Sequence, residues 1–272
     1  MDNMKKYRIA LSIAGSDPSG GAGLQADLKT FSACGCYGAT AVVAVVDENT
    51  QGVSGVFPVP ASFVRGQIKS VLDDLGADAV KIGMLHSSEM ILTVKETLAE
   101  YNIRNIVLDP VMVATSGDPL LEPEAVETLR NELVPFARII TPNIPEAEIL
   151  LGEKIQSQDD LPECARRLSM GRQVSVLLKA GHLSDAELVD VFYNAETDSI
   201  LRLSSPRLDT VNTHGTGCTL SSAVASFLAR GLGLDEAVTA AKKYIEKAIE
   251  TGAEYSIGHG HGPVHHFFNF WD

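Results

Sequence analysis

The stretch RIALSIAGSDPSGGAG, residues 8–23, changes character halfway along. Its first half, Arg8–Ala14, is an almost unbroken apolar run of strand length, and its second half, Gly15–Gly23, holds four glycines and a proline. The next residues, Leu24–Cys34, repeat apolar side chains at three- and four-residue spacings, which is typical of a helix. The stretch therefore predicts a strand, a glycine-rich loop and a helix, which together form the first unit of an alternating α/β fold.

The same alternation continues along most of the chain. Further strands are expected at Ala39–Val46, Ala79–Met84, Ile106–Val111, Ile139–Thr141 and Val174–Lys179, a hairpin at Leu188–Tyr193 and Ser199–Leu203, and helices at Phe63–Leu75, Ser88–Tyr101, Glu124–Val134, Thr219–Ala229 and Asp235–Gly252. Continuous apolar strands suit a sheet that is covered on both faces. Asp235 is a candidate N-cap of the last helix. Because no linker or repeat interrupts residues 1–272, we expect a single α/β domain.

Composition limits the classes of partner. The 272 residues carry a net charge of −13, which argues against a nucleic-acid surface and fits poorly with an anionic membrane. No apolar stretch approaches membrane-spanning length. Four cysteines occur without metal-ligand spacing, at Cys34, Cys36, Cys164 and Cys218. We expect a cytoplasmic protein with a small-molecule ligand; an anionic ligand would need a local site of metal or backbone amides.

The segment NTHGTGC, residues 212–218, precedes the helix expected from Thr219. Small, flexible residues at a helix start let backbone N–H groups converge on one point, where the helix dipole favours an anion. Cys218 lies at the end of this segment, where a thiolate would be stabilised. A lone buried cysteine is more often an inert core residue. Backbone N–H groups that can bind a phosphate, and a thiol that can accept a proton, nevertheless lie within one helical turn of each other. This combination favours phosphoryl transfer.

Polar residues also follow several of the expected strands. Asp109 offers a carboxylate to Mg²⁺. Asn143 and Glu146, three residues apart, either flank a hydrated Mg²⁺ or cap a helix. Lys179 either reaches phosphate oxygens or extends to the surface. In open α/β sheets ligands bind at the carboxyl ends of strands, so we expect these groups to share one crevice with the Gly15–Gly23 loop.

Two further motifs point less directly to chemistry. The Gly15–Gly23 loop lacks the GxGxxG spacing of dinucleotide-binding proteins and the Gly-Lys-Ser/Thr of a P-loop, so it is either a flexible turn or a loop that covers a small ligand. The histidine-rich run His259–His266 suggests zinc, but its spacing matches no tetrahedral motif and the region has no cysteine. We interpret this run as structural packing or exposed polarity.

Six motifs together resemble the hydroxymethylpyrimidine/phosphomethylpyrimidine kinases of thiamine biosynthesis, which belong to the ribokinase-like superfamily. The resemblance extends from Ile9 to Trp271, and the motifs occur in the same order. They are Gly15–Gly23, Lys81–Met84, Leu108–Met112, Thr141–Glu146, Lys179–His182 and Asn212–Cys218.

The resemblance implies a ribokinase-like three-layer αβα sandwich, with a central, mostly parallel sheet flanked by helices, and a homodimer. It implies ATP-dependent phosphorylation of 4-amino-5-hydroxymethyl-2-methylpyrimidine, then of its monophosphate, with Mg²⁺. Two other functions stay open. One is a pyridoxal or pyridoxine kinase of the same superfamily, and the other is a pyrimidine-binding protein without catalytic activity.

The resemblance also implies roles for individual residues. Gly215, Thr216 and Gly217 form the anion hole over the transferring phosphate, and Cys218 stands where sugar kinases of the superfamily carry an aspartate base. Metal binding falls to Asp109 and Glu146, and ATP binding to Asn143, Lys179 and Thr213. The pyrimidine pocket is implied at Gly15, Asp27, Met84 and Val111, together with Glu48.

Glu48 departs from the family pattern, which usually has glutamine at this position. A glutamine amide can accept a hydrogen bond from the pyrimidine amino group and donate one to a ring nitrogen, whereas an ionised carboxylate only accepts. We therefore expect Glu48 either to carry a proton or to bind a protonated aminopyrimidinium as a charge-assisted pair.

Overall fold

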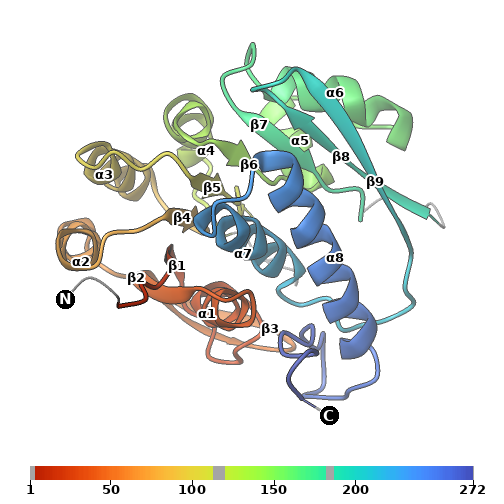
Figure 1. The fold of residues 1–272 in the computed structure, drawn as a ribbon, viewed down its shortest axis with the longest axis horizontal. Coiled ribbons are helices and arrows are strands. Elements are labelled where there is room, and N and C mark those ends of the chain that lie inside the picture. The colour runs from red at the N-terminus through yellow and green to blue at the C-terminus, as the bar shows by residue number, and fades with distance from the viewer. Residues whose placement is uncertain (1–3, 113–119, 182–186, 272) are drawn as a thin grey trace.

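The computed structural model describes residues 4–112, 120–181 and 187–271. Within these ranges the strands form one sheet in the order β3-β2-β1-β4-β5-β6-β7-β8-β9 (Figure 1). The strands are β1 (Ile9–Gly15), β2 (Tyr37–Asn49), β3 (Gly52–Pro58), β4 (Ala79–Ile82), β5 (Ile106–Leu108), β6 (Ile139–Ile140), β7 (Ser175–Leu178), β8 (Glu187–Asn194) and β9 (Ser199–Pro206). From β2 to β7 the neighbours pair in parallel; β3, β8 and β9 pair antiparallel at the two edges. The mostly parallel sheet is confirmed.

Helices cover both faces of this sheet. They are α1 (Gly23–Ala33), α2 (Ala61–Asp74), α3 (Ser88–Ala99), α4 (Ala125–Thr128), α5 (Ile144–Leu151), α6 (Leu161–Leu168), α7 (Thr216–Ala229) and α8 (Leu234–Gly252). One apolar core joins α2 to α6 with sheet residues such as Leu11 and Ile13. A second core joins α1, α7 and α8 with Ala10, because alternate strand residues point to opposite faces. The result is the expected three-layer αβα sandwich (Figure 1).

Most differences from the expected elements have local causes. The helix expected at residues 124–134 is interrupted, since α4 passes into a π-helical turn at Leu129–Leu133. Asp235 is not the N-cap of α8: Gly233 is, and Asp235 lies in the first turn, where it accepts a hydrogen bond from Asn194. Strand β3 and helix α6 were not expected, and α5 was expected only as the helix that Asn143 and Glu146 would cap if they do not serve a metal.

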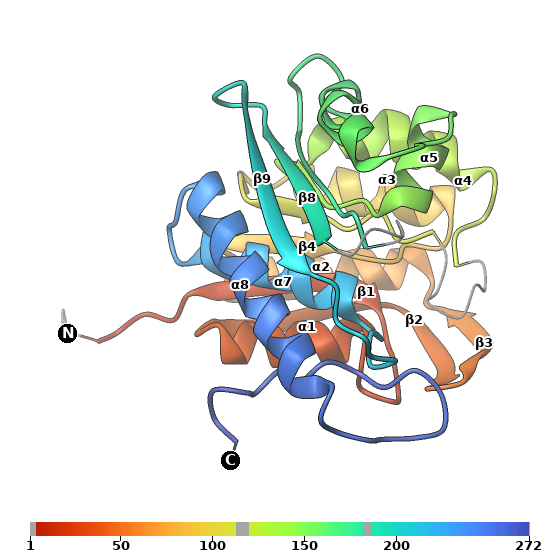
Figure 2. The same ribbon diagram turned by 90° about the vertical axis from the view of Figure 1, so that its right-hand side faces the viewer.

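The parallel strands bring the functional segments to one edge of the sheet. All six run in the same direction, so the loops after β1, β4, β5, β6 and β7 and the far end of β2 lie at the same edge. Helix α7 packs against β1, β4 and β5 with its N-terminus at this edge (Figure 2). In the described residues no helix is long and apolar enough to cross a membrane.

Candidate active site

A cavity of about 910 Å³ opens at the carboxyl edge of the sheet. It is lined by all but one of the residues that the sequence singled out for a site. These are Gly15, Glu48, Met84, Asp109, Val111, Asn143, Glu146, Lys179, Thr213, Gly215, Thr216, Gly217 and Cys218. The expectation that strand-end residues and the start of α7 share one crevice is therefore confirmed.

The start of α7 forms a close backbone turn. Gly215 is its N-cap, with a left-handed φ of 75°, and a Cβ there would lie 1.8 Å from the carbonyl oxygen of Gly21. Only glycine fits this contact. At Gly217, in the first turn, an added Cβ would lie 3.3 Å from Lys179 Nζ and 3.5 Å from Asp109 Oδ2. The first turn of the helix, the lysine and the aspartate thus face one space.

Asp109 and Glu146 share the positive charge of Lys179. Lys179 Nζ lies 3.3 Å from Asp109 Oδ1, which also accepts from Thr141 Oγ1 at 2.9 Å. Burial alone would raise the pKa of Asp109, but the charges of Lys179 and Lys81 hold it below its ordinary value. Burial raises the pKa of Glu146 to about 7, against the opposing charge of Lys179.

Glu146 and Asn143 also form a capping box at the start of α5. Asn143 Oδ1 accepts from the backbone N–H of Glu146 at 2.9 Å, and Glu146 Oε2 accepts from the backbone N–H of Asn143 at 2.8 Å. The sequence left open whether these two residues cap a helix or serve a metal. The cap is present, and both residues line the cavity as well.

The donor set fits Mg²⁺ that is shared with phosphates. Two buried carboxyl groups, Asp109 and Glu146, lie beside the ammonium of Lys179, and a divalent cation would favour the ionised form of Glu146. Among the described residues no group of three or more His, Cys, Asp or Glu side chains could hold a metal alone. Mg²⁺ commonly binds through one or two carboxylates plus substrate phosphates, so this sparse set is sufficient.

Cys218 lines the cavity, but its thiol is not activated as expected. Burial raises its pKa to about 11, although the nearby charge of Lys81 acts in the opposite direction. The prediction of a stabilised thiolate is therefore wrong for this structure. Loss of water around the sulfur outweighs the attraction of Lys81 and the hydrogen bond from the backbone of Gly23.

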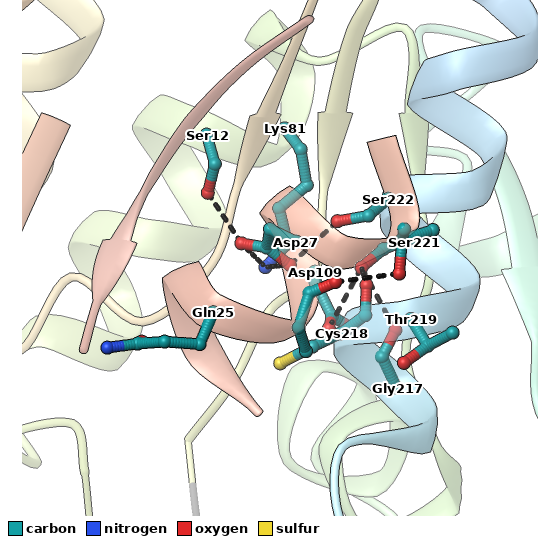
Figure 3. A network of polar contacts seen from close by, with 12 residues as sticks. Ser12, Gln25, Asp27, Lys81, Asp109, Gly217, Cys218, Thr219, Ser221 and Ser222 are labelled. Carbon is teal, nitrogen blue, oxygen red and sulfur yellow. Dashed lines mark hydrogen bonds and ion pairs between the residues drawn. The ribbon is translucent and has the colours of Figure 1, made fainter. Parts of the chain in front are cut away.

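Asp27 is the one predicted site residue that does not line the cavity. Its fully buried carboxylate lies 2.9 Å from Lys81 Nζ through both oxygens and accepts hydrogen bonds from Ser12 and Ser222 (Figure 3). Lys81 does line the cavity, and burial would lower its pKa, but the charge of Asp27 raises it. The expected direct contact between Asp27 and a substrate is thus corrected: Asp27 holds Lys81 in place, and the charge of Lys81 acts on Cys218.

Asp17 and His214 line the cavity as well, and neither of them was singled out from the sequence. His214 Nε2 lies 2.8 Å from Asp17 Oδ2 and 4.0 Å from Glu48 Oε1. Burial lowers the pKa of His214, but the hydrogen bond to Asp17 more than compensates and raises it. Asp17 Oδ2 also accepts from the backbone N–H groups of Gly21 and Ala22, so it fixes the glycine-rich loop. Both residues lie within quoted motifs, but nothing in the sequence indicates that they meet.

Comparison with known proteins agrees with this arrangement. Over 264 residues, 97% of the chain, it is 48% identical to a hydroxymethylpyrimidine/phosphomethylpyrimidine kinase from Rhizobium meliloti, covering 98% of that protein. The structure of a phosphomethylpyrimidine kinase from Clostridium difficile has a TM-score of 0.77 at 44% identity, covering 89% of this chain and 99% of that one. An ADP complex of Bacillus subtilis pyridoxal kinase has a TM-score of 0.86 at 39% identity, covering 96% and 98%.

Fold and cavity contents together define the class as a phosphotransferase of the ribokinase-like superfamily. A family model described as phosphomethylpyrimidine kinase matches residues 17–265. The chain belongs to the phosphomethylpyrimidine kinase family.

Proposed function

We propose that this enzyme transfers the terminal phosphoryl group of ATP to 4-amino-5-hydroxymethyl-2-methylpyrimidine and then to its monophosphate, in thiamine biosynthesis. The observation that carries the proposal is the single cavity in which the amide-rich start of α7 faces Lys179, Asp109 and Cys218. Relatives that carry this activity in their names align with nearly the whole chain.

In this proposal positioning and electrostatics account for most of the catalysis, as in other phosphoryl transfers. The backbone amides of residues 215–217 bind the transferring phosphoryl group as negative charge develops on it. The ammonium of Lys179 lies at the same point, and Asn143 and Thr213 line the ATP side of the cavity. Mg²⁺, held by Asp109 and Glu146, would supply further neutralisation of phosphate charge.

Cys218 is proposed to take the proton of the acceptor hydroxymethyl group. Because its pKa is raised, the thiol is almost entirely protonated at neutral pH and only a small fraction can accept a proton. The backbone anion hole therefore contributes more to the rate than the sulfur does. The second acceptor is a phosphate that is already largely ionised and needs little help from a base.

The acceptor ring is proposed to lie between Gly15, Glu48, Met84 and Val111. Gly15 is tightly enclosed, since a Cβ there would lie 2.7 Å from Met84 Cε. Glu48 lies within 4.0 Å of His214, whose imidazole bonds Asp17, so the polar end of this pocket is densely charged. Such a pocket suits an aminopyrimidine that carries a proton.

ATP turnover with hydroxymethylpyrimidine tests the proposal directly. We expect the purified protein with ATP and Mg²⁺ to give the monophosphate and then the diphosphate, both followed by mass. Pyrimidine binding without any ATP consumption would instead support the non-catalytic alternative.

A pyridoxal kinase is the second candidate, favoured by the likeness to the Bacillus subtilis pyridoxal kinase structure. Both substrates are flat heteroaromatic rings with a hydroxymethyl group. Parallel assays that compare kcat/KM for hydroxymethylpyrimidine and pyridoxal decide between them. A higher value for pyridoxal would overturn the pyrimidine assignment.

We also infer a cytoplasmic homodimer of single-domain subunits. The four cysteines are all free, which supports a reducing compartment. Val45 and Phe57 lie opposite each other across β2 and β3 and are 53% and 71% exposed, which supports a subunit contact on this hairpin. Light scattering on the purified protein tests the dimer; a monomer mass would contradict it.

A further inference from the structure

The histidine- and glycine-rich segment at residues 258–263 makes specific backbone contacts that the proposed chemistry does not explain. We call it the C-terminal strap. After α8 the chain runs out to the tip of the β2–β3 hairpin and returns toward the start of α7 (Figure 2). The strap thus contacts two segments that lie far apart in the sequence and that carry cavity residues, Glu48 on one and His214 and Gly215 on the other.

At its outer end the strap binds Thr50, in the turn between β2 and β3. Thr50 Oγ1 accepts from the backbone N–H groups of His259 and Gly260, both at 3.2 Å, and its carbonyl oxygen accepts from His261 N–H at 2.8 Å. A Cβ on Gly260 would lie 1.9 Å from that carbonyl oxygen. This close contact requires glycine at position 260.

At its inner end the strap binds the loop that leads into the anion hole. The carbonyl oxygen of Gly262 accepts from His214 N–H at 3.0 Å, directly before Gly215. A Cβ on Gly262 would lie 2.1 Å from Asn212 Oδ1. Asn212 Nδ2 in turn donates to the carbonyl oxygens of Gly252 and Tyr255 at 2.8 and 2.7 Å. Both ends of the strap therefore use close backbone contacts.

The histidine side chains contribute little to these contacts. In the strap, His261 Nδ1 lies 3.2 Å from the carbonyl oxygen of Val211, and the side chain of His259 is exposed. Behind the strap, His266 Nε2 meets Thr219 Oγ1 at 3.0 Å. The backbone and the glycines are what hold the strap to its neighbours.

We propose that the C-terminal strap is a positioning segment for phosphoryl transfer. Thr50 lies two residues beyond Glu48, at the free end of an edge hairpin whose register shifts between Asp47 and Glu48. Among the described strands, β1 is the one other strand that pairs with β2 and so anchors the hairpin in the sheet. By joining Thr50 to the residue before Gly215, the strap fixes the acceptor end of the cavity relative to the phosphate end.

The proposal rests on the kinase function above and concerns the distance between acceptor and donor. Since small errors in the placement of reacting groups are costly, loosening the strap weakens use of the acceptor while leaving ATP binding intact. A role in stability alone would instead lower the unfolding temperature and leave both KM values unchanged.

Two matched pairs of variants test this. Thr50→Val removes the Oγ1 acceptor and keeps the shape, whereas Thr50→Ser keeps the hydroxyl. Gly260→Ala forces the strap away from Thr50, whereas Gly55→Ala, on the same hairpin, adds a Cβ with no neighbour closer than 3.9 Å. We expect Thr50→Val and Gly260→Ala to raise the KM for the pyrimidine about tenfold with an unchanged KM for ATP. Thr50→Ser and Gly55→Ala should match the wild type.

Hydrogen exchange at residues 259–261 provides a readout that does not depend on activity. It should accelerate in Thr50→Val and not in Thr50→Ser. Unchanged exchange, or an unchanged acceptor KM with an active wild type, overturns the strap proposal and leaves the kinase function standing. An inactive wild type with normal exchange differences overturns the kinase function instead. If Gly260→Ala fails to fold, the Thr50 pair decides.

Discussion

Cys218 lines the cavity. Its thiol stays protonated at neutral pH, because burial raises its pKa to about 11. The first transfer should therefore accelerate as the pH rises from 6 to 9 and more of the sulfur becomes thiolate. Cys218→Ala should remove this rise and slow the first transfer by roughly 10²-fold, the lower range for a general base. The second transfer should change little. Single-turnover rates of each step, followed by mass, check this; equal losses in both steps contradict the role of the thiol.

Lys81 and Asp27 form a buried ion pair whose charges act on that thiol. Lys81→Met leaves the Asp27 carboxylate buried without its partner and should destabilise the protein by about 3–5 kcal/mol. The double variant Lys81→Met/Asp27→Leu should recover most of this loss, since replacing a whole buried pair by apolar residues is often neutral. Urea unfolding measures both effects.

The double variant also separates stability from electrostatics at the site. The charge of Lys81 lowers the pKa of Cys218 and the charge of Asp27 raises it, with Lys81 the larger effect. Loss of both should therefore slow alkylation of Cys218 modestly at a given pH, even where stability is recovered. Alkylation as fast as in the wild type would show that the pair has no influence on the sulfur.

The sequence predicted the positions of site residues better than their ionisation. Asp109 and Lys179 follow buried strands, so topology alone brings them together. Asp27 and Cys218 were misjudged because burial, which depends on what α1 and α7 pack against, decides their chemistry. The pairing of Asp17 with His214 joins two loops far apart in the chain, and no local pattern encodes it.

At the scale of the helix, glycine at position 217 makes α7 less stable but leaves space for a phosphate beside Lys179 and Asp109. It lies in the first turn of α7 without a left-handed φ, and an added Cβ points toward Lys179 and Asp109. Gly217→Ala should stabilise the helix by up to about 1 kcal/mol yet reduce kcat/KM, because the methyl group enters the phosphate position. Gly66→Ala, in α2 with no atom within 4 Å of its Cβ, should stabilise without loss of activity. A fully active Gly217→Ala would place the phosphate elsewhere.

A helix or strand could be predicted where its apolar pattern differed clearly from that of the neighbouring segments. The parallel strands are short apolar runs between helices, and all were found. Strand β3 contains Gly52, Gly55 and Pro58, which are typical of turns, and it exists because β2 extends far enough to pair with it. Helices α5 and α6 each span 8 residues and carry a proline in their first turn, so their periodicity was too brief to detect.

At the scale of the whole molecule, Glu146 links stability to pH and metal. Its pKa is about 7 in the folded protein against an ordinary 4.5, so between these values the unfolded chain has lost a proton that the folded chain keeps. Stability therefore falls as the pH rises through this window, by about 1.4 kcal/mol per pH unit, and the loss is complete above pH 7. Glu146→Gln should flatten this part of the profile, and its amide oxygen can still accept from Asn143 N–H, so the cap of α5 remains.

Metal binding should reverse this loss, because Mg²⁺ favours the ionised form of Glu146 that burial disfavours. We expect Mg²⁺ with a non-hydrolysable ATP analogue to raise the unfolding temperature more at pH 8 than at pH 5.5. A tenfold higher affinity for Mg²⁺ and the analogue adds about 1.4 kcal/mol to the free energy of unfolding at saturation. In Glu146→Gln the Mg²⁺-induced rise in unfolding temperature should differ less between pH 8 and pH 5.5. The remaining carboxylate, Asp109, has a lowered pKa and is ionised at both pH values. If wild type and variant show the same Mg²⁺ shift at both pH values, Glu146 is a helix cap and no more, and the metal is held by Asp109 and the phosphates alone.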